Sequence, residues 1–303
     1  MRKNKPYAML IVFAAFLWSL GAFFRRKLFG IPPATIVFYE HLISVLLILP
    51  WSPRFFKEYK KLTKKDWLVM LLVGLVGGTL GTLFFTSALG MVNNISYSVV
   101  VLLQQTQPIF AVILAVIFLK ERFNKEYVFL AIAALITAYF LAFPGYKQVI
   151  LYNGQEVQAI FLALAAAAAW GSGTVFGRMM LGKLSFVALA NLRFLIVLPS
   201  IFILSIILNQ TYPITAISFT QWQQIIAIAI FGRIVAFIAF YKGLQYTEAK
   251  IATFAELADP VGAIIIGYFL LGERLTLIQW LSAATLMTII IIMSLRSKKD
   301  LSK

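Results

Sequence analysis

Two clusters of polar side chains interrupt apolar stretches of the chain, and each cluster stands just before a proline. Residues 104–107 read Gln-Gln-Thr-Gln before Pro108, and Glu256 and Asp259 precede Pro260. A proline inside a helix removes a backbone hydrogen bond and frees a carbonyl group that a cavity or a neighbouring helix must satisfy. We therefore expect both clusters to line one central cavity that binds a polar solute, or else to join neighbouring helices.

Three carboxylates are candidates for proton coupling, namely Glu40, Glu256 and Asp259. A carboxylate in a low-dielectric surrounding takes up a proton more readily, which suits a proton carrier. Arg193 and Arg233 are the obvious counter-charges, and pairing with them would keep the carboxylates ionised and structural. The sequence leaves both interpretations open.

Two tryptophans stand in matching apolar stretches, where they could stack on a ligand or fill the core. Small residues beside both would let helices approach closely. His41 is the single histidine, and we expect it to be a packing residue rather than a proton relay. The residues expected to line the cavity are Trp18, Gln104, Gln107, Trp170, Arg233, Glu256 and Asp259.

Two Glu-Arg pairs end two of the apolar stretches, Glu121 with Arg122 and Glu273 with Arg274. At such a place a carboxylate pairs with a basic residue or caps the N terminus of a neighbouring helix. We expect all four residues to be structural and not to contact substrate.

The composition sets the class of protein that must position these groups. Of 303 residues, 61% are hydrophobic and 13% charged, and the mean hydropathy is +0.90. A soluble chain carries about 25% charged residues, so the sequence predicts an all-α integral membrane protein. The net charge of +16 does not imply a nucleic-acid partner, because membrane proteins gather Lys and Arg in cytoplasmic loops. With no cysteine, one histidine and no evident nucleophile–base pair, we expect no metal, no cofactor and no enzyme activity.

Ten apolar stretches have about the length of a membrane span. They cover residues 7–24, 35–50, 67–89, 95–119, 127–143, 157–180, 186–208, 225–241, 251–271 and 278–295. With the N terminus in the cytoplasm, 20 of the 27 basic residues fall on the cytoplasmic side and 5 on the other. This bias predicts that both termini are cytoplasmic.

The two halves of the chain repeat each other at an offset of 152 residues. Trp18 and Gly21 match Trp170 and Gly173, and the Pro–(LKER) pattern at 108–122 matches the Pro–(LGER) pattern at 260–274. Five spans per half is an odd number, so the second copy must cross the membrane in the opposite sense. Such inverted repeats are typical of secondary transporters.

These motifs resemble the EamA domain, in which a five-span unit has an early Trp-Gly span, a proline in its fourth span and an L-x-E-R end. Two such units resemble the ten-helix drug/metabolite transporter superfamily over nearly the whole chain. The resemblance implies a first repeat at residues 1–146 and a second at 147–303, with a cavity beside the fourth and ninth helices. Three extra residues in the first half, between Leu89 and Ile95, depart from the pattern and affect the outer side.

The expected function is a secondary transporter in the cell membrane, working by alternating access, with export as the expected direction. Its partners are a small-molecule substrate and the lipid bilayer, and a homodimer remains open. Three carboxylates against two arginines within the spans leave one net negative charge, which favours amino acids or amine-bearing solutes. Arg193, Arg233 and Lys250 meeting in the cavity without partners would instead favour a nucleotide-sugar or phosphate-ester exchanger. A lipid flippase is a further alternative.

Overall fold

The computed structural model describes residues 5–119, 125–142, 154–180, 183–246, 255 and 258–300. Within these ranges the chain is helical apart from short turns and contains no β-strand. The first half forms α1 (Lys5–Lys27), α2 (Pro33–Ile48), α3 (Phe56–Tyr59), α4 (Lys64–Leu72), α5 (Gly81–Gly90), α6 (Tyr97–Gln104), α7 (Gln107–Leu119) and α8 (Lys125–Ala142). The second half forms α9 (Gly154–Met180), α10 (Phe186–Ile207), α11 (Phe219–Ala227), α12 (Ala236–Tyr246), α14 (Ala258–Leu271) and α15 (Leu277–Asp300). Two 3-10 segments, η1 (Leu49–Phe55) and η4 (Ile214–Ala216), lie in the connections.

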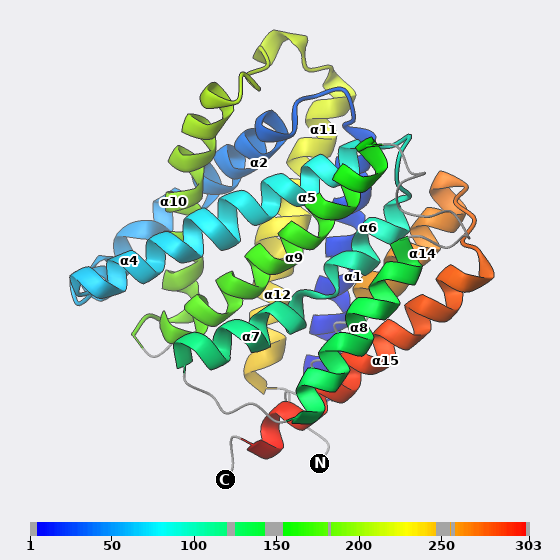
Figure 1. Cartoon of the computed structure of the whole chain (residues 1–303). Coiled ribbons are helices and arrows are strands. Elements are labelled where there is room, and N and C mark those ends of the chain that lie inside the picture. Colours follow the sequence, from blue (N-terminus) through cyan, green and yellow to red (C-terminus); the bar gives the residue numbers. More distant parts are fainter. Residues whose placement is uncertain are drawn as a thin grey trace.

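Six helical segments are long and apolar enough to cross a bilayer, which confirms an all-α membrane protein. They are Met9–Lys27, Pro33–Tyr59, Lys64–Gly90, Gly154–Gly177, Val187–Ile207 and Phe219–Phe240. Shorter apolar helices lie at Ile132–Leu141, Ala258–Leu271 and Leu277–Ile289. The start of α1 and the end of α15 lie at the same end of the bundle in Figure 1. The expected repeat boundary, between residues 146 and 147, lies outside the described residues.

The helices of the two halves pack crosswise. The first helix of the first half, α1, contacts α12 and α14 of the second half, and α9 correspondingly contacts α5 and α7 of the first. In the same way α2 lies against α10, and α8 lies beside α15, as the green and red ribbons of Figure 1 show. Neither half therefore has a core of its own, because each buries its first helix in the other.

The fourth apolar stretch is two helices rather than one bent helix. α6 ends at Gln104 and α7 begins at Gln107. In the turn between them, the N–H groups of Gln105 and Thr106 donate to the carbonyls of Leu102 and Leu103, each at 3.1 Å. Pro108 is thus the second residue of a helix, where its missing N–H would have no helical partner anyway. In the other half, Pro260 occupies the third position of α14.

Two π-helical segments, η2 (Val73–Leu80) and η5 (Ile228–Val235), interrupt the third helix of each half. Both lie where backbones approach each other closely. A Cβ on Gly77 would lie 2.6 Å from the Cα of Gly173, and one on Gly232 would lie 3.6 Å from the Cα of Gly21. The approach at Gly77 and Gly173 requires glycine, whereas the distance at Gly232 is an ordinary van der Waals contact.

Candidate functional site

At the polar break between α6 and α7, one side-chain hydrogen bond joins the two halves of the chain. Gln104 Nε2 donates to Gln107 Oε1 at 3.0 Å, and Gln105 Nε2 donates to Asp259 Oδ2, also at 3.0 Å. Gln105 also reaches Gln104 Oε1 at 3.4 Å. The structure thus brings three of the four expected polar groups together, while Glu256 lies outside the described residues. Cavity lining by these groups stays a prediction.

The two tryptophans occupy equivalent positions in the crosswise packing. The ring of Trp18 lies 5.1 Å from that of Phe240 in α12, and the ring of Trp170 lies 5.0 Å from that of Phe85 in α5. Trp18 also meets Phe237 edge-on at 6.0 Å. Both contacts join the first helix of one half to the third helix of the other, so each tryptophan contributes to the interface between the halves.

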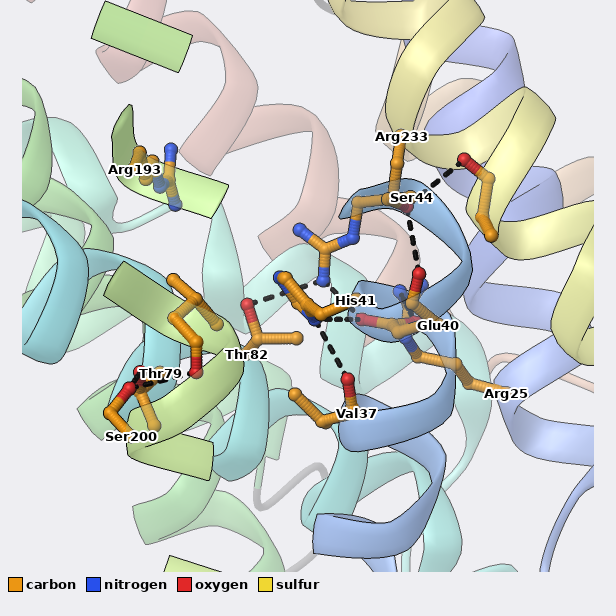
Figure 2. A network of polar contacts seen from close by, with 12 residues as sticks. Arg25, Val37, Glu40, His41, Ser44, Thr79, Thr82, Arg193, Ser200 and Arg233 are labelled. Atoms are coloured by element: carbon orange, nitrogen blue, oxygen red, sulfur yellow. Dashed lines mark hydrogen bonds and ion pairs between the residues drawn. The ribbon is translucent and has the colours of Figure 1, made fainter. Parts of the chain in front are cut away.

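Glu40 sits at the centre of a buried ion cluster that joins α1, α2 and η5. Its carboxylate oxygens form ion pairs with Arg25 and Arg233, and all three side chains are buried (Figure 2). Arg233 also donates to Thr82 Oγ1 at 3.3 Å. His41 Nδ1 donates to the Val37 carbonyl at 2.8 Å. These contacts close the helices around Glu40.

Arg25 is the member of the cluster that sequence reasoning missed. Arg25 directly follows the first apolar stretch together with Arg26 and Lys27, and so the sequence shows it only as part of a basic run at the end of that stretch. No local signal separates Arg25 from its neighbours, since its partner lies 15 residues away on another helix. Arg233, expected in the cavity, instead lies against Glu40, so the condition for a phosphate-ester exchanger fails at this residue. Lys250 lies outside the described residues.

Glu273 caps the N terminus of α6. It accepts bonds from the Tyr97 N–H, the Ser98 N–H at 3.0 Å and the Ser98 hydroxyl at 2.7 Å. This is the capping alternative that the Glu-Arg pattern suggested, while Arg274 lies over the Tyr268 ring at 4.2 Å. Glu121 and Arg122 lie outside the described residues.

Arg26 fixes the connection before α6 to α1. Its guanidinium donates to the carbonyls of Leu89, Val92 and Ile95 at 3.1, 2.9 and 2.7 Å. An open cavity of about 540 Å³ lies beside it, lined by Asn93 and other residues of this connection and by the end of α14. The three extra residues of the first half belong to this connection and so shape that cavity.

A smaller cavity of about 40 Å³ lies between η2, α9, α10 and α12. Among the residues whose side chains the structure describes, Arg193 is the one charged residue in its lining. The guanidinium donates to the Gly77 carbonyl at 2.9 Å and lies 5.9 Å from the centre of the Phe237 ring.

Comparison with known proteins gives a consistent family. The model of the EamA-like transporter family matches residues 5–143 and again 157–295. The chain is 33% identical to the riboflavin transporter ImpX of Fusobacterium nucleatum, over 94% of this chain and 96% of that protein. It is 24% identical to the uncharacterized transporter YwfM of Bacillus subtilis, over 98% and 97% of the two chains. A crystal structure of a protein with 14% identity covers 98% of this chain and 99% of its own, with a TM-score of 0.62, and supports the fold.

Proposed function

This chain belongs to the EamA-like transporter family, and we propose that it is a ten-span secondary transporter of the cell membrane whose substrate is riboflavin or a closely related flavin. The observation that carries the substrate is the 33% identity to a riboflavin transporter along almost the full length of both chains. Members of one transporter family bind different substrates because the residues of their binding sites differ. The proposed substrate must therefore also agree with the chemistry of the described residues.

The charges near the site suit a neutral solute. Glu40 is paired with two arginines, so it is engaged within the protein rather than exposed to a cationic ligand. The preference for amino acids and amines rests on three carboxylates against two arginines within the spans, and Arg25 adds a third arginine to that count, which makes the two charges equal. Riboflavin is uncharged at neutral pH, so it needs no buried counter-charge.

The side chains between the halves offer what a flavin requires. The isoalloxazine ring system is flat and aromatic, and the rings of Trp18, Phe240, Phe85 and Trp170 lie at the interface between the halves. Its ribityl hydroxyls match amide groups, which Gln104 and its neighbours supply at the break between α6 and α7. Aromatic faces with a few placed polar groups are typical of small-molecule sites.

Alternating access agrees with the crosswise packing. Each first helix, α1 or α9, is buried against the third and fourth helices of the other half. A tilt of one half against the other changes both sets of contacts in opposite ways, which opens one end as it closes the other. Inverted repeats, with both termini in the cytoplasm, would build the two ends of the transporter from equivalent helices.

The test is flux through purified protein in proteoliposomes. Riboflavin is offered outside or preloaded inside, with and without an imposed pH gradient, and its own fluorescence reports its movement. A pool of amino acids and amines and the phosphorylated flavin are offered in parallel and read by mass spectrometry. We expect riboflavin to move and the amino acids and the phosphorylated flavin to stay. Movement of amino acids without riboflavin would overturn the flavin proposal, and the preloaded vesicles test the expected export.

A further inference from the structure

The two halves can be compared position by position, because their matching contacts fix the register. An offset of 152 residues relates Trp18 to Trp170, and one of 155 residues relates the π segment that starts at Val73 to the one that starts at Ile228. Contacts obey both offsets: Ser44 Oγ lies 3.4 Å from the Ala229 carbonyl, and at the matching positions Ile196 lies against Gly74. The Trp18–Phe240 and Trp170–Phe85 pairs match in the same way.

At these offsets the buried ion cluster has no counterpart in the other half. Each residue of the cluster has a matching residue in the other half. The pairs, with the cluster residue first, are Arg25 with Gly177, Glu40 with Leu192, His41 with Arg193, Thr82 with Phe237 and Arg233 with Gly78. One place in the repeat is thus filled by two arginines and a glutamate. The matching place in the other half has Gly177 and Gly78 at the positions of those arginines. Its one cationic side chain among the matched positions is Arg193, which lies beside the Phe237 ring. Figure 2 shows Arg193 apart from the contacts around Glu40.

At Gly177, one of these two glycines, the missing side chain leaves empty space, whereas Val197 fills the space beside Gly78. Gly177 is buried, yet a Cβ at this position would meet no heavy atom of the described side chains and backbone within 4 Å. The cavity of about 40 Å³ is located here, lined by Gly173, Gly177, Arg193, Phe194 and Phe237 among others. Such a volume admits water, whereas a metabolite needs a pocket of roughly 300 Å³ or more. The described state is therefore closed around the cavity, which must widen to admit a substrate.

We propose that the cavity at Gly177 and Arg193 is a substrate subsite that receives the carbonyl-bearing edge of a planar aromatic solute when this end of the transporter opens. The proposal rests on the flavin substrate proposed above. An arginine presents several N–H donors in a fixed plane, which suits adjacent carbonyl oxygens, and Phe194 and Phe237 supply faces on which a ring stacks. A cationic site rejects protonated amines by like-charge repulsion, so it selects against the alternative substrates.

Gly177 determines the specificity of the subsite, because the absence of a side chain leaves room for the ring of the solute. Filling the space with Gly177→Leu adds a side chain where a ring would enter, and we expect flux of riboflavin to fall by roughly tenfold or more, since pockets discriminate to that degree against added bulk. Gly154→Leu is the matched control, because Gly154 lies on the same helix, is exposed and likewise has no heavy atom near its Cβ position. It should retain wild-type flux. Equal losses in both variants at equal folded yield would overturn the subsite.

The natural absence of cysteine permits a test that needs no transport. Gly177→Cys and Gly154→Cys are treated with a membrane-impermeant thiol reagent applied to each side of sealed vesicles in turn. The two positions lie near opposite ends of α9, so we expect labelling from opposite sides, with riboflavin protecting Gly177→Cys alone. Failure to label Gly177→Cys from either side, while Gly154→Cys reacts, would overturn the subsite.

The same labelling separates this proposal from the flavin assignment. Protection of Gly177→Cys by an amino acid or amine and not by riboflavin would overturn the flavin substrate and the planar ligand together. If riboflavin is transported but leaves the labelling of Gly177→Cys unchanged, the transporter function stands and the subsite is wrong.

Discussion

Glu40 and Arg233 come from opposite halves of the chain and form a buried ion pair between α2 and η5. Arg25 pairs with the other oxygen of the same carboxylate, so one glutamate holds two arginines in the protein interior. A buried charge that loses its partner is strongly destabilising, whereas an intact buried ion cluster contributes little net stability. The main role of the intact cluster is therefore to hold α1, α2 and η5 together, rather than to add to the free energy of unfolding.

Glu40→Gln should destabilise the protein by about 3–5 kcal/mol, because it leaves two buried guanidinium groups without a counter-charge. Thermal unfolding in detergent measures the loss, with Glu126→Gln on the exposed part of α8 as control. The double variant Glu40→Gln with Arg233→Met should recover part of it, since one uncompensated charge is removed as well. A double variant no more stable than Glu40→Gln would contradict the pairing.

Asp259→Asn should remove any response of transport to an imposed pH gradient if Asp259 is the proton carrier. The amide can still accept a bond from Gln105, as the carboxylate does at 3.0 Å, so folding should be preserved. Proteoliposome flux with and without the gradient, at matched folded yield, is the measurement. Flux that still follows the gradient would assign coupling to one of the other two carboxylates that the sequence offers, Glu40 or Glu256.

Glu273→Ala should lower stability by about 0.5–2 kcal/mol, the usual effect of losing a helix cap. The carboxylate holds two N–H groups and a hydroxyl at the start of α6, and Glu273→Gln should cost less because its carbonyl oxygen still accepts. Melting temperatures of the two variants, compared with Glu126→Gln, give the order. An alanine variant as stable as wild type would show that the cap is dispensable.

The sequence predicts the helices and the repeat because both depend on apolar length and on spacing along the chain. For Glu273 the sequence offers two roles, pairing with a basic residue or capping a neighbouring helix, and the structure shows the capping of α6. Close packing at the glycines of the third helix follows from residue size alone, as Gly81 against Trp170 illustrates.

The pairing of side chains between distant helices could not be predicted in the same way. Arg25 and Arg26 are adjacent and chemically identical, yet one pairs with Glu40 and the other binds three carbonyls of the connection before α6. The π segments likewise depend on tertiary packing, because local propensities permit a continuous α-helix at η2 and η5.

Gly173→Ala should destabilise the interface between α9 and η2, because the added methyl group would lie 2.9 Å from the Cα of Gly77. Backbone must move to accommodate it, and overpacking of this kind costs about 1–3 kcal/mol. Gly154→Ala on the same helix has open space and should be neutral or slightly stabilising, since alanine favours a helix more than glycine does. Folded yield and melting temperature of the two variants decide the matter. The Gly173 variant must be the less stable, because its Cβ meets backbone and the other meets nothing, and a reversed order would mean that the two halves do not approach at Gly77.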